Sequence, residues 1–217
     1  MEPTIITFED WTLRVRPPAG KPVRVLLMLH GWTGDEMSMW FLARNFDDRF
    51  WLLAPRAPYS TPQRGFSWRP PFPEKEYPPT YEQMRISAAM LLDLIDRWGI
   101  ANAVDVNMID IMGFSQGAAQ AITFALTYPK RIRKMGVLAG FAPKGIEQLV
   151  SFKPLEGKPV FITHGVSDEL VPIETAHTTL KLLEQAGACV TFCEAEIGHK
   201  VSAECLRALE AFFSPDS

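Results

Sequence analysis

The segment 109–126, IDIMGFSQGAAQAITFAL, constrains the fold more than any other part of the chain. Its first half is an apolar run typical of a buried strand, and its second half has the composition of a helix. Between the halves stands Ser115, with a glycine two positions away on each side. This arrangement fits the strained strand-to-helix turn that exposes a nucleophilic serine above a sheet, although a plain turn can have the same letters. The other residues must decide between the two.

Strands and helices alternate along the remaining chain. Apolar strands are predicted near residues 23–30, 51–55, 106–113, 135–140, 159–165 and 189–195. Helices are predicted near residues 35–46, 84–99, 118–126 and 173–185, with a last helix that ends at 213. This order predicts the α/β class, with a mostly parallel twisted sheet flanked by helices on both faces. The 217 residues suffice for a single domain, 1–217, whose ligands bind at the carboxyl ends of the strands.

A serine hydroxyl needs a base to remove its proton, and the chain has four histidines. His30 and His164 each end a predicted strand, so we expect packed structural residues there. His177 lies on a predicted helix, on its exposed face. His199 follows the last strand, in a loop that can extend over the sheet edge, and is therefore the predicted base.

An acid must hold that histidine, and in enzymes with this serine turn it falls between the serine and the histidine. Asp168 comes directly after the strand 159–165 and is the predicted acid. Glu169, Glu194 and Glu196 are rivals, and Asp168 could instead cap a turn.

Acyl transfer places negative charge on an oxygen, which two backbone N–H groups usually receive. We expect one from Gln116, directly after the serine, and the other from Trp32, because Gly31 lets the backbone turn inward. The loop 30–34 lacks the spacing and the lysine of a phosphate-binding loop, so nucleotide binding is not expected.

Residues 56–79 are rich in proline and aromatic side chains and show no periodicity. Phe66, Trp68, Phe72 and Tyr77 argue against disorder, so we expect an ordered loop that covers the active site. An apolar acyl pocket is predicted from the aromatic and aliphatic residues near the strand ends, although such residues also pack in cores. The predicted pocket residues are Trp32, Phe66, Trp68, Phe141 and Leu170.

The net charge of −3 and the absence of a basic block argue against nucleic acid as a partner. No apolar stretch approaches the roughly 20 residues that span a bilayer, and the first residues lack the pattern of a secretory signal. Cys189 and Cys193 lie about 13 Å apart along one predicted strand, too far for a disulfide. With Cys205 they are expected to be reduced thiols, which fits a cytoplasmic protein.

Six stretches have the same order and spacing as in one known family: LLMLHGWTGDE, APRAP with FSW, MGFSQGAAQA, VLAGFAP, ITHGVSDELVP and IGHKVSAE. With them the chain, from about residue 23 to 213, resembles the α/β-hydrolase superfamily and, within it, the phospholipase/carboxylesterase family that includes acyl-protein thioesterases. The resemblance implies a triad of Ser115, Asp168 and His199, with oxyanion N–H groups from Trp32 and Gln116. It also implies that no metal or cofactor is needed, and it makes a homodimer plausible. The residues between Gly31 and Gly34 are more similar to bacterial carboxylesterase-like members, and residues 69–79 lie where the family varies.

Together these observations predict a serine hydrolase that cleaves a small-molecule carboxylic ester or thioester through an acyl-enzyme on Ser115. The expected partners include neither nucleic acid nor a membrane in which the chain is embedded. An acyltransferase with the same triad and a non-catalytic binding protein on the same scaffold are the alternatives. Lysophospholipids, short esters and thioesters all fit the predicted residues.

Overall fold

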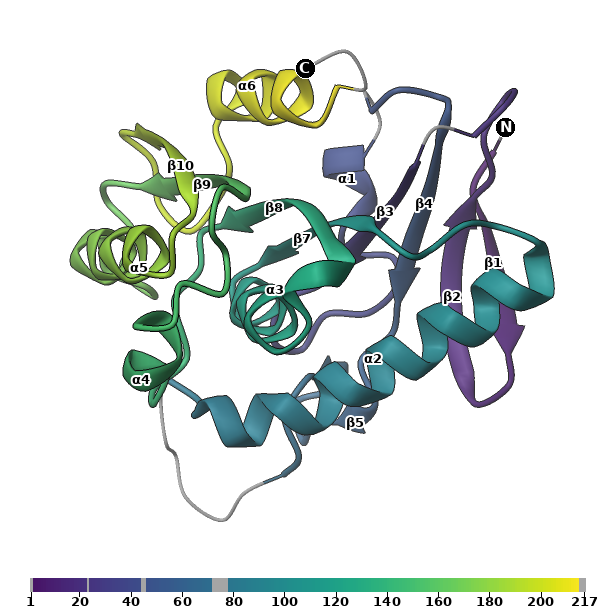
Figure 1. Ribbon diagram of the computed structural model, residues 1–217, viewed down its shortest axis with the longest axis horizontal. Helices are drawn as coiled ribbons and strands as arrows, with labels where there is room; N and C mark the ends of the chain where they lie inside the picture. The colour runs from purple at the N-terminus through teal and green to yellow at the C-terminus, as the bar shows by residue number, and fades with distance from the viewer. Residues whose placement is uncertain (1, 23, 44–45, 72–77, 215–217) are drawn as a thin grey trace.

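The computed structural model describes residues 2–22, 24–43, 46–71 and 78–214, and it contains an eight-stranded sheet with helices on both faces (Figure 1). The strand order is β1-β2-β4-β3-β7-β8-β9-β10. The strands from β4 to β10 in this order pair in parallel, whereas β1 and β2 pair antiparallel at one edge. The predicted fold class, a mostly parallel sheet between helices, is confirmed.

The strands of the main sheet are β1 (Thr4–Phe8), β2 (Trp11–Arg16), β3 (Arg24–Leu29), β4 (Phe50–Pro55), β7 (Ile109–Phe114), β8 (Ile132–Leu138), β9 (Pro159–Gly165) and β10 (Cys189–Ala195). Two short strands, β5 (Tyr59–Ser60) and β6 (Phe66–Ser67), form a separate antiparallel ribbon. The helices are α1 (Trp40–Ala43), α2 (Tyr81–Asn102), α3 (Gln116–Thr127), α4 (Glu147–Val150), α5 (Ile173–Gln185) and α6 (Ala203–Phe213). A 3₁₀ turn, η1 (Pro129–Arg131), precedes β8.

The side chains of each central strand enter two separate hydrophobic cores. In β3, Val25, Leu27 and Leu29 pack into the core beneath α2, α3 and α5, whereas Leu26 and Met28 pack into the core beneath α1 and α6. Figure 1 shows α6 on one side of the sheet and α2, α3 and α5 on the other. A strand buried on both faces reads as a continuous apolar run, which explains why these strands were predictable from the sequence.

The antiparallel hairpin of β1 and β2 was not predicted. It turns at Glu9, which has a φ of 52°, and β2 then pairs with β4. Only Leu13 and Val15 of β2 are buried, in the period-two alternation of a strand covered on one face. This alternation was the available signal, and it is weaker than the continuous runs of the central strands.

The predicted helix over 35–46 is mostly wrong, because α1 begins only at Trp40. Asp35 Oδ1 accepts hydrogen bonds from Met37 N at 2.9 Å and from Ser38 Oγ at 3.0 Å. Such local side-chain bonds hold the backbone in turns and compete with a helix. Residues 44–45, in the last part of the prediction, lie outside the described residues.

The predicted helix over 84–99 is longer than expected. It begins after a capping box at Thr80 and Gln83 and continues past Gly99 to Asn102. A Cβ on Gly99 would lie 2.5 Å from the Val106 side chain, so this glycine allows a close approach rather than ending the helix. None of the helices formed by the described residues has the length and apolar character needed to cross a membrane.

The expectation that all three cysteines are reduced thiols is wrong. Cys193 in β10 and Cys205 in α6 form a disulfide with a Cα–Cα distance of 5.8 Å, and Cys189 is free and exposed. The spacing along the strand excluded only a bridge between Cys189 and Cys193. The partner of Cys193 comes from a helix that folds back against β10, and such an approach cannot be read from sequence spacing.

Candidate active site

Ser115 stands at the junction of β7 and α3, in a strained backbone conformation with φ 53° and ψ −117°. A Cβ added to Gly113 would lie 2.0 Å from the carbonyl oxygen of Gly117, and one added to Gly117 would lie 2.2 Å from that of Leu29. Both approaches are far shorter than any van der Waals contact. The two glycines of the sequence pattern are therefore required by the geometry of the turn.

Asp168 follows β9, and its side chain accepts hydrogen bonds through both oxygens. Oδ2 lies 2.7 Å from His199 Nδ1, and Oδ1 accepts from the backbone N–H groups of Leu170 and Val171 at 2.9 Å each. The Asp168 side chain is 0% exposed, whereas that of His199 is 17% exposed. The structure thus brings the predicted acid and the predicted base into direct contact and leaves the base open to solvent.

His164 is buried in β9, as the sequence predicted, and it also touches the acid. Its Nε2 lies 2.7 Å from the carbonyl oxygen of Val171, which can only accept, so Nε2 carries the proton. The same Nε2 lies 3.4 Å from Asp168 Oδ2. Burial lowers the pKa of His164, so its ring is neutral and adds no competing charge beside the acid. This contact was not predicted from the sequence.

The loop that carries His199 is attached to the end of β9. Val166 N donates to Ala195 O at 2.9 Å and Ser167 N donates to Ile197 O at 3.0 Å. The ring of His199 lies 4.9 Å, centre to centre, from the ring of Phe114, the residue directly before Ser115. These contacts place the imidazole beside the serine turn.

The loop after β3 lies against the same turn. A Cβ on Gly31 would lie 3.4 Å from Ser115 Cβ, so the backbone at Gly31 passes directly beside the serine. His30 is buried and holds this backbone: its Nε2 accepts from Ala57 N at 3.0 Å, and its Nδ1 donates to Gly31 O at 2.7 Å. Burial also lowers the pKa of His30, which fits a neutral ring with one donor and one acceptor.

The two predicted oxyanion donors, the N–H groups of Gln116 and Trp32, lie in different backbone surroundings. Gln116 is the first residue of α3, where backbone N–H groups have no partner within the helix. In the loop 31–34, Thr33 N donates to Phe66 O and Gly34 N donates to Gly31 O, both at 3.0 Å. Within the described parts of the chain, no such acceptor is found for the Trp32 N–H. Among the described residues both predicted N–H groups thus lack an acceptor, and their role as oxyanion donors stays a prediction.

The side chain of Gln116 has a second role, which was not predicted from the sequence. Its Oε1 accepts from Trp68 N at 3.0 Å, and its amide contacts Ser67 Oγ at 3.1–3.3 Å. This buried amide ties the first residue of α3 to the β6 ribbon, which in turn holds the loop 31–34.

An ion pair fixes the far end of the loop after β3. Arg56 donates to Glu36 through Nε at 2.7 Å and through Nη2 at 2.8 Å, and its guanidinium lies 4.7 Å from the centre of the Phe66 ring. Arg56 holds the pKa of Glu36 below its usual range, so the pair stays charged. Such a bidentate ion pair fixes the orientation of the loop as well as its position.

A groove of about 230 Å³ opens next to the serine turn. It is bounded by the loop after β3, by α1 and its preceding turn, and by the end of β7. The lining residues are Gly31, Trp32, Thr33, Gly34, Ser38, Met39, Phe41 and Phe114.

The predicted acyl pocket needs correction. Trp68 and Phe141 are 0% and 1% exposed, so they belong to the core and present no surface to a substrate. The indole N–H of Trp68 donates to His30 O at 2.8 Å and so ties the core to the loop after β3. Phe66 and Leu170 do not line the groove; Leu170, at 68% exposed, stands next to the acid. Of the predicted pocket residues, Trp32 does line the groove.

The predicted covering loop, 56–79, is only partly described. The ribbon of β5 and β6 lies against the loop after β3 through the bonds between Phe66 and residues 33–34. Residues 72–77, which include Phe72 and Tyr77, lie outside the described residues. Whether this segment covers the site stays a prediction.

An α/β-hydrolase is defined by a mostly parallel sheet with a serine turn at the end of a central strand, an acid after a later strand and a histidine after the last strand. The described residues have all four features. A model of the phospholipase/carboxylesterase family matches residues 12–215. The chain therefore belongs to the phospholipase/carboxylesterase family and is a carboxylesterase-like hydrolase.

Individual relatives agree with this assignment. Carboxylesterase SOBER1 of Arabidopsis thaliana is 29% identical over 203 residues, which cover 86% of this chain and 88% of that protein. Acyl-protein thioesterase 1 of Kluyveromyces lactis is 26% identical over 192 residues, which cover 80% of this chain and 82% of that protein. The crystal structure of a Bacillus cereus carboxylesterase superposes with a TM-score of 0.80 at 25% identity, over 94% of each chain.

Proposed function

We propose that this protein hydrolyses short carboxylic esters through an acyl-enzyme on Ser115, with His199 as base and Asp168 as the acid that orients it. The observation that carries the proposal is the hydrogen bond of 2.7 Å between Asp168 Oδ2 and His199 Nδ1. The ring of the same histidine packs against Phe114, directly beside the serine turn. A buried carboxylate on Nδ1 keeps the proton on that nitrogen and leaves Nε2 able to accept the serine proton.

In this proposal, a named group of the chain carries out each step of the reaction. His199 Nε2 takes the proton of Ser115 while Ser115 Oγ attacks the carbonyl carbon. The N–H groups of Trp32 and Gln116 stabilise the oxyanion, and the positive end of α3 adds to this stabilisation. His199 gives the proton to the leaving alcohol, and a water activated by the same histidine hydrolyses the acyl-enzyme.

The environment of the acid favours Asp168 over its rivals. Glu169 and Glu194 are exposed, and Glu194 lies 3.6 Å from His177, on the surface rather than at the serine turn. Among the described residues, Asp168 alone of these carboxylates contacts His199, and its side chain is fully buried. A solvated carboxylate would hold the imidazole in place less well, because water would compete for both partners.

The groove beside Trp32 suggests which esters fit. It offers apolar surface from Trp32, Phe41 and Phe114, and at about 230 Å³ it is smaller than a pocket for a drug-sized ligand. We assign the acyl arm of the substrate to this groove, which favours short acyl chains. The thioester alternative uses the same machinery and differs only in the leaving group.

The deciding experiment is hydrolysis of p-nitrophenyl butyrate by wild type and by Ser115→Ala. We expect turnover by wild type and none above background by the variant, with unchanged circular dichroism. Covalent labelling of wild type, but not of Ser115→Ala, by a fluorophosphonate would support the same nucleophile. Activity retained in Ser115→Ala would overturn the assignment, and absence of both activity and labelling in wild type would favour the non-catalytic alternative.

The acyltransferase alternative is separated by product analysis. When an alcohol or amine acceptor is added, a hydrolase releases mainly the free acid, whereas a transferase forms the new ester or amide. The cytoplasmic location and the homodimer stay predictions. The disulfide between Cys193 and Cys205 removes the argument from reduced thiols, because such bridges persist mainly in oxidising compartments.

A further inference from the structure

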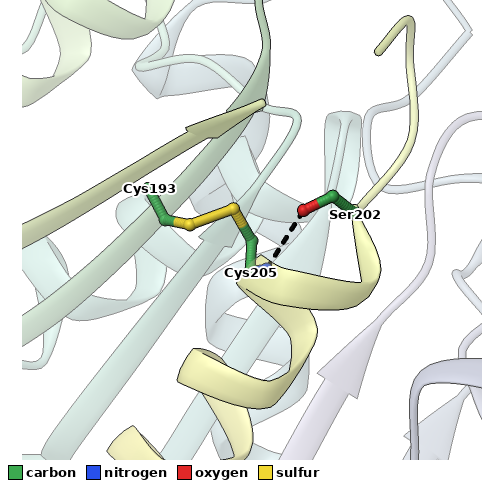
Figure 2. Close-up of a disulfide and its surroundings, with 3 residues drawn as sticks. All are labelled: Cys193, Ser202 and Cys205. Carbon is green, nitrogen blue, oxygen red and sulfur yellow. Dashed lines mark hydrogen bonds between the residues drawn. A yellow bond between two sulfur atoms is a disulfide. The ribbon is translucent and has the colours of Figure 1, made fainter. Parts of the chain in front are cut away.

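The disulfide spans the loop that carries the proposed catalytic base. It joins Cys193, in the edge strand β10, to Cys205, in the first turn of α6, as Figure 2 shows. The sequence separation is 12, and His199 is the sixth residue from either cysteine. The bridge therefore closes a ring of chain with the imidazole at its middle.

The two halves of this loop are held in different ways. The half before His199 is fixed to β9 by backbone hydrogen bonds at Ala195 and Ile197. A Cβ on Gly165 would lie 2.3 Å from Gly198 O, which shows how closely this half packs on the sheet. The half after His199 has no backbone bond to the sheet among the described residues; Lys200 N bonds only to Gly198 O, within the loop itself.

The second half is anchored through Val201, which packs against the core on that face, and through the start of α6. Ser202 caps this helix by accepting from Cys205 N at 3.0 Å (Figure 2). Ala203 and Glu204 are exposed, so Cys205, at 1% exposed, is the first residue of the helix to be buried. The bridge is thus the covalent link between the first turn of α6 and the sheet.

The far end of α6 is held independently of the disulfide. Leu209 and Phe213 are fully buried in the core on that face of the sheet. Arg24 Nη2 donates to Ser214 O at 3.1 Å, and Lys134 Nζ donates to Phe212 O at 2.7 Å. Loss of the bridge therefore leaves the helix start and the adjoining half of the loop with only the Ser202 cap and the packing of Val201 and Leu206 against that core, while the far end of the helix stays held.

From this arrangement we propose that the Cys193–Cys205 disulfide is a positioning element for His199 and makes the esterase redox-sensitive. The oxidised form holds both ends of the histidine loop and is the more active one. The reduced form stays folded, but its imidazole samples positions away from Ser115, and small displacements of a catalytic group lower the rate steeply. This inference rests on the proposed role of His199 as base.

The redox step needs a dithiol reductant. The reductant supplies two electrons and two protons, the S–S bond breaks, Cys193 and Cys205 each become a thiol, and the dithiol becomes a disulfide. Cys193 is only half-buried on an edge strand, so the bridge can be approached from that side. In an oxidising compartment the enzyme would stay in its active form, and a thiol-rich compartment would lower its activity.

The test measures kcat and KM for p-nitrophenyl butyrate before and after treatment with dithiothreitol, and again after the reductant is removed and the protein is reoxidised. Thiol titration of the denatured protein gives the redox state: one free thiol when the bridge is present, because only Cys189 is free, and three after reduction. We expect reduction to lower kcat at least about tenfold with KM changed less than about twofold, because the groove lies outside the histidine loop. Reoxidation should restore kcat.

Two variants separate positioning from general stability. The double variant Cys193→Ala/Cys205→Ala should have the low kcat of reduced wild type and show no response to dithiothreitol. Its circular dichroism should equal that of wild type. Alanine is chosen because serine would place a buried hydroxyl without a partner at position 205. Cys189→Ser is the matched control and should keep the full response to the reductant. A reduced wild type that unfolds at the assay temperature would mean that the bridge stabilises the fold rather than the loop, and would overturn the proposal.

The remaining outcomes distinguish this inference from the proposed function. An active wild type whose kcat is the same with and without the bridge refutes the inference alone. Three free thiols in oxidised, denatured protein also refute it, because no bridge then forms. A wild type that hydrolyses no ester in either redox state, and resembles Ser115→Ala, refutes the proposed function and the inference with it.

Discussion

Replacing Asp168 with asparagine tests the proposed triad most sharply, because the structure determines how the new amide must lie. Oδ1 of Asp168 accepts from the N–H groups of Leu170 and Val171, and Oδ2 lies 2.7 Å from His199 Nδ1. An amide has one oxygen and one NH₂ group, so it can satisfy only one of these two sides as the carboxylate does. Its oxygen will face the two backbone donors, and its NH₂ group will face the imidazole.

The magnitudes support this orientation. If the amide were turned over, its NH₂ group would face the two backbone N–H donors. Each donor left without an acceptor would then lower the stability by about 1–3 kcal/mol. The orientation with the oxygen toward Leu170 and Val171 gives up only one hydrogen bond, and the imidazole can recover it by accepting through Nδ1. His199 then carries its proton on Nε2 and cannot take the proton of Ser115. A wrong tautomer of this kind lowers kcat by about 10⁴, which corresponds to about 5.5 kcal/mol of transition-state stabilisation.

The assay is steady-state hydrolysis of p-nitrophenyl butyrate, with thermal unfolding as a measure of folding. We expect Asp168→Asn to lose kcat while KM and the melting temperature change little. Glu169→Gln is the matched control: it makes the same change of charge at the exposed neighbouring residue and should keep most of the activity. If Asp168→Asn retains more than about a tenth of wild-type kcat, or if Glu169→Gln loses as much, the assignment of the acid is wrong.

Three further predictions concern the groove, the serine turn and the core. Phe41 is 62% exposed beside the groove and should determine which acyl chain length is preferred. Phe41→Ala should therefore lower kcat/KM several-fold for p-nitrophenyl hexanoate but not for p-nitrophenyl acetate. Equal effects on both esters would contradict this assignment. Gly117→Ala should abolish activity and lower the melting temperature, because its Cβ would lie 2.2 Å from Leu29 O, and a fully active variant would show that the turn is not rigid. Burial raises the pKa of Asp110 from 3.8 to about 6 despite the attraction of Arg24. The folded state therefore keeps this proton to a higher pH than the unfolded state, and the associated stability is complete below about pH 4 and lost as the pH rises through about 6. Asp110→Asn should remove this part of the pH dependence in urea unfolding between pH 4 and 7, and curves parallel to those of wild type would argue against it.

Much of the fold was predictable because burial on both faces leaves a simple signature. Strands such as β3, β7 and β9 read as nearly continuous apolar runs, interrupted in β7 by Asp110, and each was predicted close to its observed position. The elements that were missed or misplaced carry weaker or competing signals. The hairpin of β1 and β2 is covered on one face only, and the start of α1 is delayed by the turn at Asp35.

The candidate site was predictable in part for a chemical reason. The serine turn requires glycine at positions 113 and 117, and this requirement is written directly into the sequence. The acid and the base were predicted from chain order, and the structure brings Asp168 and His199 into contact. The pocket was not predictable, because an aromatic side chain near a strand end can face either the core, as Trp68 does, or a groove, as Trp32 does.

The sequence by itself determined the α/β order of elements, the serine turn and the family to which the chain belongs, since these depend on residues close together in the chain. Tertiary structure alone decided which apolar side chains are exposed beside Ser115, that His164 lies against the acid, and that Cys193 meets Cys205 across the histidine loop. Each of these depends on how separate segments approach one another in the packed molecule. Such approaches leave no regular spacing in the sequence from which they could be read.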